Sequence, residues 1–214
     1  MLDAQQTQTA IKIMGEVFPQ AKTSLVADSP FHFLLAVILS AQTTDKAVNQ
    51  LTPVLFKQYP TPESLAAADE KTVRAMIKTI GLYRNKAKYL IACSQGLVEK
   101  FSSQVPQTRQ ELMQLAGVGR KTADVVLAEC FQIPAIAVDT HVSRVAKRLA
   151  IASPTASVLQ IEQTLMKKLP QAMWIAAHHR MIFWGRYQCM ARNPKCQTCP
   201  LLFLCAYGQK NLVL

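Results

Sequence analysis

The stretch "LAGVGRKTADVV", residues 115–126, places Gly117 and Gly119 just before a Lys-Thr pair. A phosphate-binding P-loop requires glycine immediately before its lysine, and Arg120 occupies that position here. Apolar residues recur at helical intervals on both sides of the glycines, and Gly117 stands where a helix C-cap is expected. The stretch therefore predicts two helices joined by a tight glycine hairpin, over about residues 108–132.

The composition favours a polyanionic partner. The chain has 214 residues, of which 50% are hydrophobic, so it can bury a core in one large or two small domains. The formal net charge is +11, and residues 163–214 contain no Asp or Glu. Nucleic acid and an anionic membrane surface would both attract this charge. A membrane binder should show a basic amphipathic helix or an anchor, and the most apolar run, residues 31–41, is shorter than the roughly 20 residues of a span. We therefore expect nucleic acid as the partner and no membrane.

The remaining sequence predicts an all-α fold. Ser29 and Thr61 each precede a proline in the way that helix N-caps do, and Asp69 can cap a third helix. Further helical patterns cover about residues 4–18, 44–58, 84–100, 139–150, 156–169 and 172–185. Only residues 134–138, "PAIAV", could form a strand, and no second segment offers it a partner. The polar N-terminus contains no hydrophobic signal region, which indicates an intracellular protein.

Four cysteines near the end of the sequence predict a metal site. They have the spacing C-x6-C-x2-C-x5-C and are Cys189, Cys196, Cys199 and Cys205. Four thiols so close together in an intracellular chain favour a metal over disulfides. Structural zinc usually uses two paired knuckles, and only one C-x2-C pair is present; the common ferredoxin spacing also differs. The spacing alone leaves zinc and a [4Fe-4S] cluster open. Cys93 and Cys130 lie on apolar helical faces and are expected to be buried residues without a chemical role.

Taken in order, these motifs resemble the endonuclease III family of helix-hairpin-helix DNA glycosylases. The resemblance is carried by the hairpin, by "LSAQTTD" (39–45), by "IGLYRNKA" (80–87), by "IAVDTHVSRV" (136–145) and by the cysteine spacing. It covers about residues 30–205. It implies a [4Fe-4S] cofactor rather than zinc.

The resemblance also implies a two-lobed fold and an activity. The expected lobes are a six-helix barrel lobe at residues 23–133, which contains the hairpin, and a discontinuous [4Fe-4S] lobe made of residues 1–22 and 134–214. The expected activity is that of a base-excision repair glycosylase with AP lyase activity. Its partner would be double-stranded DNA containing damaged bases, namely oxidised or ring-saturated pyrimidines, or abasic sites. The protein would act as a monomer in the bacterial cytoplasm, associated with the nucleoid.

Two residues carry the catalytic roles that the resemblance implies. Lys121 would be the nucleophile that attacks the sugar of the damaged nucleotide; judged from the sequence alone, it would be a lysine that contacts phosphate. Asp139 would be the catalytic carboxylate, and it is also well placed to N-cap the helix that follows it. A carboxylate can stabilise the positive charge that develops on the sugar as the base leaves.

Further residues are expected to contact DNA. By resemblance, Gln42 would fill the space that a flipped nucleotide leaves, and Leu82 would wedge into the opposite strand. The other candidates are the hairpin residues, one histidine and two basic residues of the cysteine loop: Gly117, Val118, Gly119, Arg120, His141, Arg192 and Lys195. The chain departs from the family pattern at Ala116, where proline is usual, and at Asp124, where asparagine is usual. We expect Asp124 to add negative charge near the DNA.

Two rival functions are compatible with parts of this pattern. An adenine glycosylase of the mismatch-repair type shares the hairpin and the cluster but lacks the lysine that Lys121 provides. A non-catalytic DNA-binding or electron-transfer protein would bind DNA and contain a cluster but would release no base.

Overall fold

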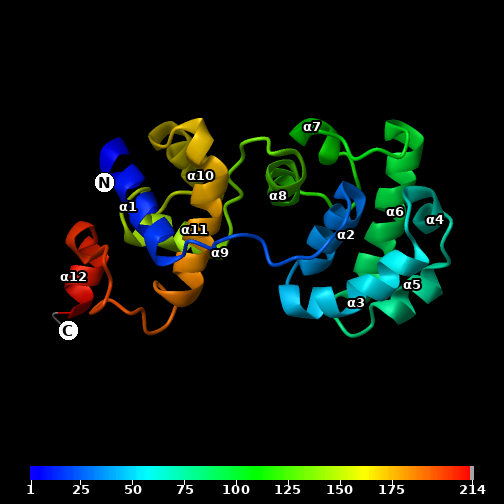
Figure 1. Ribbon diagram of the computed structural model, residues 1–214, viewed down its shortest axis with the longest axis horizontal. Helices are drawn as coiled ribbons and strands as arrows, with labels where there is room; N and C mark the ends of the chain where they lie inside the picture. The colour runs from blue at the N-terminus through cyan, green and yellow to red at the C-terminus, as the bar shows by residue number, and fades with distance from the viewer. Residues whose placement is uncertain (213–214) are drawn as a thin grey trace. The chain divides into compact units, whose positions relative to one another are not determined.

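The computed structural model describes residues 1–212, and this part of the chain is helical without strands, which confirms the all-α prediction (Figure 1). Residues 134–138, the one candidate strand, have no regular structure. The chain divides into two compact units. The hairpin unit comprises residues 24–133, and the cysteine unit comprises residues 1–23 together with the chain from residue 134 onward.

The hairpin unit is built from seven helical segments, two of which are only five and four residues long. They are α2 (Pro30–Ser40), α3 (Asp45–Gln58), α4 (Pro62–Ala66), α5 (Glu70–Met76), α6 (Tyr83–Phe101), α7 (Arg109–Leu112) and α8 (Arg120–Phe131). The predicted caps are confirmed: the side chains of Ser29, Thr61 and Asp69 each accept a hydrogen bond from the backbone amide three residues later.

Helix α2 forms the centre of the hairpin unit. Residues 31–39 are all buried, so this helix is apolar on every side, as expected for a helix that neighbours surround. It packs against α3, α6 and α8. The apolar run that is too short to span a membrane is therefore the core helix that supports the hairpin.

The first helix of the hairpin ends earlier than predicted. The sequence indicated helix up to Gly117, but α7 ends at Leu112. From there the backbone continues in i→i−3 hydrogen bonds: the amides of Gln114, Leu115 and Val118 donate to the carbonyls of Glu111, Leu112 and Leu115. These tighter turns keep the apolar spacing close to the helical one, which is why periodicity did not reveal the end of the helix.

The cysteine unit joins the N-terminal helix to the C-terminal part of the chain. Its elements are α1 (Ala4–Val17), α9 (Thr140–Arg148), α10 (Val158–Lys168), η1 (Gln171–Met173), α11 (Trp174–Tyr187), η2 (Leu202–Leu204) and α12 (Ala206–Leu212). Helix α1 packs on α11, and Gly15 allows close approach there: a Cβ atom on Gly15 would lie 2.5 Å from Cζ of Arg180. Residues more than 160 positions apart are thereby packed into one core.

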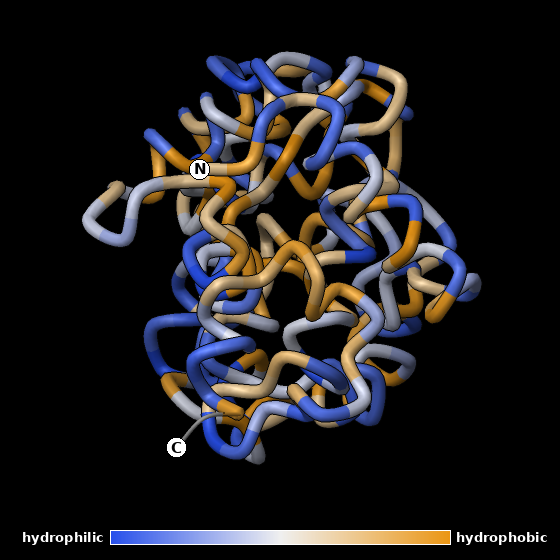
Figure 2. Tube along the Cα trace, turned by 90° about the vertical axis from the view of Figure 1, so that its left-hand side faces the viewer, coloured by the Kyte–Doolittle hydropathy of each residue, from blue (hydrophilic) through white to orange (hydrophobic). Residues whose placement is uncertain are grey.

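Polar and apolar residues alternate along most of the helical turns, which is the pattern of helices with one buried face (Figure 2). Within residues 1–212, no helix is both long enough and apolar enough to cross a lipid bilayer.

Candidate functional site

Gly117 is required by both the conformation and the packing of the hairpin. Its φ is +76°, in the left-handed region that side chains disfavour. A Cβ atom there would lie 3.0 Å from Cβ of Tyr89 on α6 and 3.3 Å from Cγ2 of Ile38 on α2. The turn is therefore pressed directly onto the core of the hairpin unit.

Neither the backbone conformation nor the packing requires glycine at position 119. It is the N-cap of α8 with φ −90° and ψ 176°, which any residue can adopt, and a Cβ atom there would meet nothing within 4 Å. No side chain caps this end of the helix. The surface beside Gly119 is thus open backbone at a helix N-terminus, where the helix dipole favours an anion.

The side chains around Gly119 point in different directions. Val118 is buried, 6% exposed, so it anchors the turn and could contact a ligand only through its backbone. Arg120 and Lys121 are exposed, and they are the first two residues of α8. Lys121 therefore lies in the first turn of the helix, close to its N-terminus.

Asp124 does not add an open charge to this surface, as we had expected. Its side chain is 1% exposed, and Oδ1 accepts a hydrogen bond of 2.6 Å from Nε of Arg109. This ion pair joins α7 to α8 and fixes the two arms of the hairpin. The expectation was wrong because the partner lies on a different helix, fifteen residues earlier in the sequence.

Asp139 is held in place by the helix that it begins. Its Oδ1 accepts a hydrogen bond of 2.8 Å from the backbone amide of Val142, which confirms the predicted N-cap of α9. The residue is partly buried. A cap that fixes the orientation of a partly buried carboxylate is a suitable setting for one that acts on a substrate.

His141 lies two residues further on, in the first turn of α9, and packs against α11. A Cβ atom on Gly185 would lie 2.7 Å from Cβ of His141, and Nη2 of Arg144 lies 3.1 Å from the His141 ring nitrogen Nδ1. These contacts favour the packing role of His141, while its contact with DNA stays a prediction. His178 and His179 are buried.

Gln42 and Leu82 share an unusual backbone conformation. Their φ angles are +54° and +59°, although neither is glycine, and both side chains are exposed. Leu82 is a branched apolar residue that is 53% exposed at the N-cap of α6. Strained conformations of this kind persist where the surrounding structure imposes them, and they are concentrated at functional sites.

The four C-terminal cysteines are brought together. Cys189, Cys196, Cys199 and Cys205 line one pocket, together with apolar side chains that include Leu149 and Trp184. Burial raises the pKa of the Cys199 and Cys205 thiols above the ordinary value. Metal binding requires the thiolate, so a bound cation would have to offset this effect.

Hydrogen-bond donors surround these sulfur atoms. Nη1 of Arg148 lies 3.5 Å from Sγ of Cys189, the backbone amide of Gly208 donates to Sγ of Cys205 at 3.3 Å, and Nδ2 of Asn211 lies 3.8 Å from Sγ of Cys196. Donors of this kind stabilise thiolates that bind an iron-sulfur cluster. The residues present therefore fit a group held by four thiolates.

Two arginines of α9 hold the loop that begins at Cys189. Nε of Arg144 donates to the carbonyl of Cys189 at 3.0 Å, and Arg148 donates to the carbonyls of Met190 and Ala191 at 2.7 and 3.1 Å. Neither arginine is among the residues predicted from the sequence. Their spacing of four residues, which places both on one face of a helix, was the available signal.

Arg192 and Lys195 are exposed on the same loop. Their contact with DNA stays a prediction. Cys93 and Cys130 lie outside this region, and burial raises the pKa of each to about 12, so neither is a reactive thiol.

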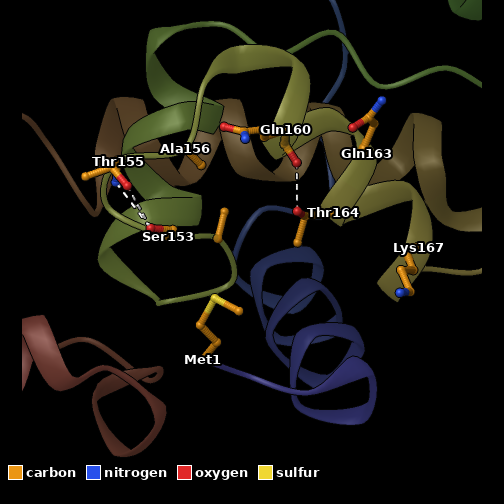
Figure 3. Close-up of a pocket in the computed structure, with 9 residues that line it drawn as sticks. Met1, Ser153, Thr155, Ala156, Gln160, Gln163, Thr164 and Lys167 are labelled. Carbon is orange, nitrogen blue, oxygen red and sulfur yellow. Dashed lines mark hydrogen bonds between the residues drawn. The ribbon is translucent and has the colours of Figure 1, made fainter.

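A separate pocket of about 420 Å³ opens on the cysteine unit between Met1, the loop at residues 153–156 and α10 (Figure 3). Five of its nine lining residues carry hydroxyl or amide side chains, and Lys167 is the charged side chain among the nine. Thr164 Oγ1 donates to the backbone carbonyl of Gln160 at 2.7 Å. None of the residues that the sequence singled out lines this pocket, and we assign no function to it.

Comparison with known proteins gives two matching family models. The model described as HhH-GPD superfamily base excision DNA repair protein matches residues 35–171, and the iron-sulfur binding domain of endonuclease III matches residues 189–205. The second match covers the four-cysteine segment.

Curated relatives and solved structures agree with these models. The chain is 49% identical to endonuclease III of Bacillus subtilis (strain 168), over 99% of this chain and 96% of that protein. It is 44% identical to endonuclease III of Escherichia coli (strain K12), over 90% of each. The structure of a non-covalent endonuclease III–DNA complex superimposes with a TM-score of 0.96 at 48% identity, covering 100% of both chains. A trapped endonuclease III–DNA covalent intermediate gives 0.95 at 48% identity, covering 99% of this chain and 100% of that one.

Proposed function

Because the chain belongs to the endonuclease III family of HhH-GPD base excision DNA repair proteins, we propose how its own residues bind and cleave damaged DNA. The protein is a DNA glycosylase with AP lyase activity, and it carries a [4Fe-4S] cluster. The single observation that carries the residue assignment is the exposed Lys121 amine in the first turn of α8, two residues after the open backbone of Gly119.

Lys121 is the nucleophile in this proposal. The neutral Nζ attacks C1′ of the damaged nucleotide, the glycosidic bond breaks, and the base leaves with a proton. The nitrogen and the opened sugar then form an iminium ion, which water as nucleophile could not provide. Loss of a proton from C2′ breaks the bond between C3′ and its phosphate oxygen, which nicks the strand. One amine thereby supports both base removal and strand cleavage.

Asp139 stabilises the charge that this reaction generates. The sugar becomes positive as the base departs, and a carboxylate fixed beforehand lowers the free energy of that state without reorganising. The hydrogen bond from the Val142 amide supports this role because it fixes the orientation of the carboxylate. The carboxylate can also accept and return protons around the amine.

The hairpin, Gln42 and Leu82 hold the DNA in the reactive form. The backbone beside Gly119 accepts a phosphate at the N-terminus of α8, which grips DNA without reading its sequence. Gln42 fills the gap that the extruded nucleotide leaves, and Leu82 wedges the opposite strand. Filling the gap offsets part of the unstacking free energy, which is a few kcal/mol.

The four thiolates of Cys189, Cys196, Cys199 and Cys205 ligate the cluster. When bound, the group supplies iron-thiolate bonds that cross-link the segment, which contains little regular structure of its own. Arg144 and Arg148 fix the backbone of the adjoining loop, so that Arg192 and Lys195 are presented to phosphates.

The substrate class follows from the family and from the charge. We assign oxidised or ring-saturated pyrimidines in duplex DNA as the damaged bases, and abasic sites as lyase substrates. The net charge of +11 supports binding to the bacterial nucleoid in the cytoplasm. The protein acts there as a monomer.

Borohydride trapping tests the assignment of Lys121. Incubating the protein with duplex DNA that contains an oxidised pyrimidine, in the presence of borohydride, should reduce the iminium and link protein to DNA through a peptide containing Lys121. Lys121→Gln should lose both trapping and strand cleavage while it still binds lesion DNA. Lys12→Gln, which makes the same charge change at an exposed position of α1, is the control and should be trapped normally.

Trapping of the Lys121→Gln protein at the normal level would show that another amine is the nucleophile. Binding without base release by the unaltered protein would favour the non-catalytic DNA-binding function.

A further inference from the structure

Lys86 on α6 is a buried lysine with an unusual setting. It is 3% exposed, and within residues 1–212 its ammonium takes part in no ion pair. Its Nζ donates a hydrogen bond of 2.7 Å to Oγ1 of Thr43. Burial lowers the pKa of Lys86, as expected for an amine removed from water. A lysine is rarely buried without a carboxylate partner, so the bond to Thr43 calls for a physical explanation.

The acceptor of this bond lies next to Gln42. An ammonium can only donate, so the Thr43 hydroxyl accepts from Lys86 and its own proton is available for a second bond. That hydroxyl faces the carbonyl of Ala41 at 3.4 Å, and the Thr43 amide donates to the carbonyl of Ser40 at 3.0 Å. The hydroxyl of Thr43 thus bridges to the carbonyl of Ala41 across Gln42. This bridge holds the turn in which Gln42 has a positive φ.

The backbone of Lys86 contacts Leu82, which shares the positive φ of Gln42. Its amide donates to the carbonyl of Leu82 at 3.0 Å, which closes the first turn of α6 over the left-handed Leu82. No side chain caps this helix. Lys86 thus bonds Thr43, the neighbour of Gln42, through its side chain and bonds Leu82 through its backbone.

We propose that Lys86 is a positioning residue that locks the Gln42 loop to the start of α6, so that Gln42 and Leu82 are set for insertion before DNA arrives. This inference rests on the proposed function, which assigns insertion to Gln42 and Leu82. What it adds is a physical connection between Gln42 and Leu82 through Lys86. A hydrogen bond from a charged donor is roughly twice as strong as a neutral one, and the burial of Lys86 shields this bond from part of the competing water. The bond keeps the turns at Gln42 and Leu82 in one arrangement before DNA binds. It thereby lowers the free-energy cost of ordering these two residues on insertion.

Two variants break the lock from opposite sides. Lys86→Met keeps the length and suits a buried apolar site, so α6 remains packed, but it removes the donor. Thr43→Val keeps the shape of threonine and removes the hydroxyl. Thr43→Ser, which retains the hydroxyl, is the matched control. If Lys86 merely filled space, Lys86→Met would behave like the unaltered protein.

The test compares a duplex that must be opened with a strand that is already open. On duplex DNA with a single oxidised pyrimidine, Lys86→Met and Thr43→Val should each slow base release by about tenfold, the effect of losing one buried hydrogen bond to a charged group. The double variant should be no slower than either single one, because both remove the same bond. Thr43→Ser should retain the normal rate. Borohydride trapping on a single-stranded abasic oligonucleotide, where no stack has to be filled, should be unchanged in all four proteins.

A fluorescent base analogue placed beside the lesion gives a readout that does not depend on catalysis. Its fluorescence rises when the stack opens, and we expect this rise to be smaller with Lys86→Met and Thr43→Val than with the unaltered protein. Normal duplex rates and normal fluorescence in both variants would overturn the inference. Loss of single-stranded trapping along with duplex activity would also overturn it, because Lys86 would then support the fold rather than insertion. Failure of the unaltered protein to be trapped would count against the proposed function instead, and the fluorescence measurement would still decide the role of Lys86.

Discussion

At the scale of single residues, Asp139 combines a structural and a chemical role that one substitution can separate. Asparagine caps helices as well as aspartate does, so Asp139→Asn should keep the bond to the Val142 amide and the stability of α9. It removes the negative charge, so base release should slow by about 10² or more while lesion DNA is still bound. Single-turnover kinetics and thermal unfolding would measure the two effects.

Asp139→Ala is the companion variant. It removes the cap as well as the charge and should also cost about 1 kcal/mol in the free energy of unfolding. Base release by Asp139→Asn at the normal rate would exclude the charge from the chemistry.

The two glycines of the hairpin should respond differently to substitution. Gly117→Ala places a side chain at φ +76° against Tyr89, so it should destabilise the protein by about 1–2 kcal/mol. Gly119→Asp meets open space and a conformation that any residue adopts, so the protein should keep its stability. Its added bulk and charge should weaken DNA binding on every sequence. Thermal unfolding and fluorescence anisotropy would separate the two outcomes, and unchanged affinity of Gly119→Asp would remove the hairpin from the interface.

Local features of single residues could be predicted from the sequence, and distant pairings could not. The caps at Ser29, Thr61 and Asp139 depend on a side chain and an amide three residues later, so the sequence contains all of the information. The Arg109–Asp124 pair depends on two helices meeting. Lys86 is the strongest case, since lysine is normally a surface residue and only the packed structure shows its burial. The catalytic roles came from family resemblance, because a lysine after a glycine turn is more often a phosphate contact.

At the scale of elements, helix α9 has a role at each end. Asp139 caps its N-terminus, and Arg144 and Arg148 hold the loop after Cys189 from its C-terminal half. We expect Arg148→Met to loosen that loop, because it loses donors to two carbonyls and to the Cys189 sulfur. Retention of the cluster against an iron chelator should fall by about tenfold or more, the usual effect of removing a group that supports a metal ligand.

The neighbouring Lys147→Met variant is the control for this prediction, because it removes the same charge from the same helical turn. The decay of the cluster absorbance during chelation would measure both variants. Equal decay in Arg148→Met and the unaltered protein would show that the arginine does not support the loop.

The sequence predicted which helices exist more accurately than it predicted where they end. The starts of helices capped by polar residues were placed within a few residues, because those signals act locally. The end of α7 was missed since i→i−3 turns preserve the apolar spacing of a helix over so short a segment. The four-cysteine segment contains little regular structure, and its shape depends on the group that it binds rather than on periodicity.

At the scale of the whole molecule, the charge predicts how DNA binding responds to salt. The net charge of +11 and the absence of acidic residues from 163–214 favour many phosphate contacts. The logarithm of the binding constant should therefore fall linearly with the logarithm of the salt concentration, by about 0.9 for each phosphate contacted. Arg120→Gln should reduce that slope by about 1. Lys12→Gln makes the same change in net charge on α1, and an equal reduction in both variants would indicate diffuse attraction rather than a contact at the hairpin.

The discontinuity of the cysteine unit sets the order in which the chain can fold during synthesis. The hairpin unit is complete once residue 133 has left the ribosome, whereas α1, made first, packs on α11, which ends at Tyr187. At roughly 5–20 residues per second, the apolar face of α1 waits on the order of 10 s or more for its partner. During that interval it is a segment that a nascent-chain chaperone can bind, and iron-sulfur delivery must come later still, because the last cysteine is residue 205. Helix α1 is therefore made before the hairpin unit but completes its packing after it.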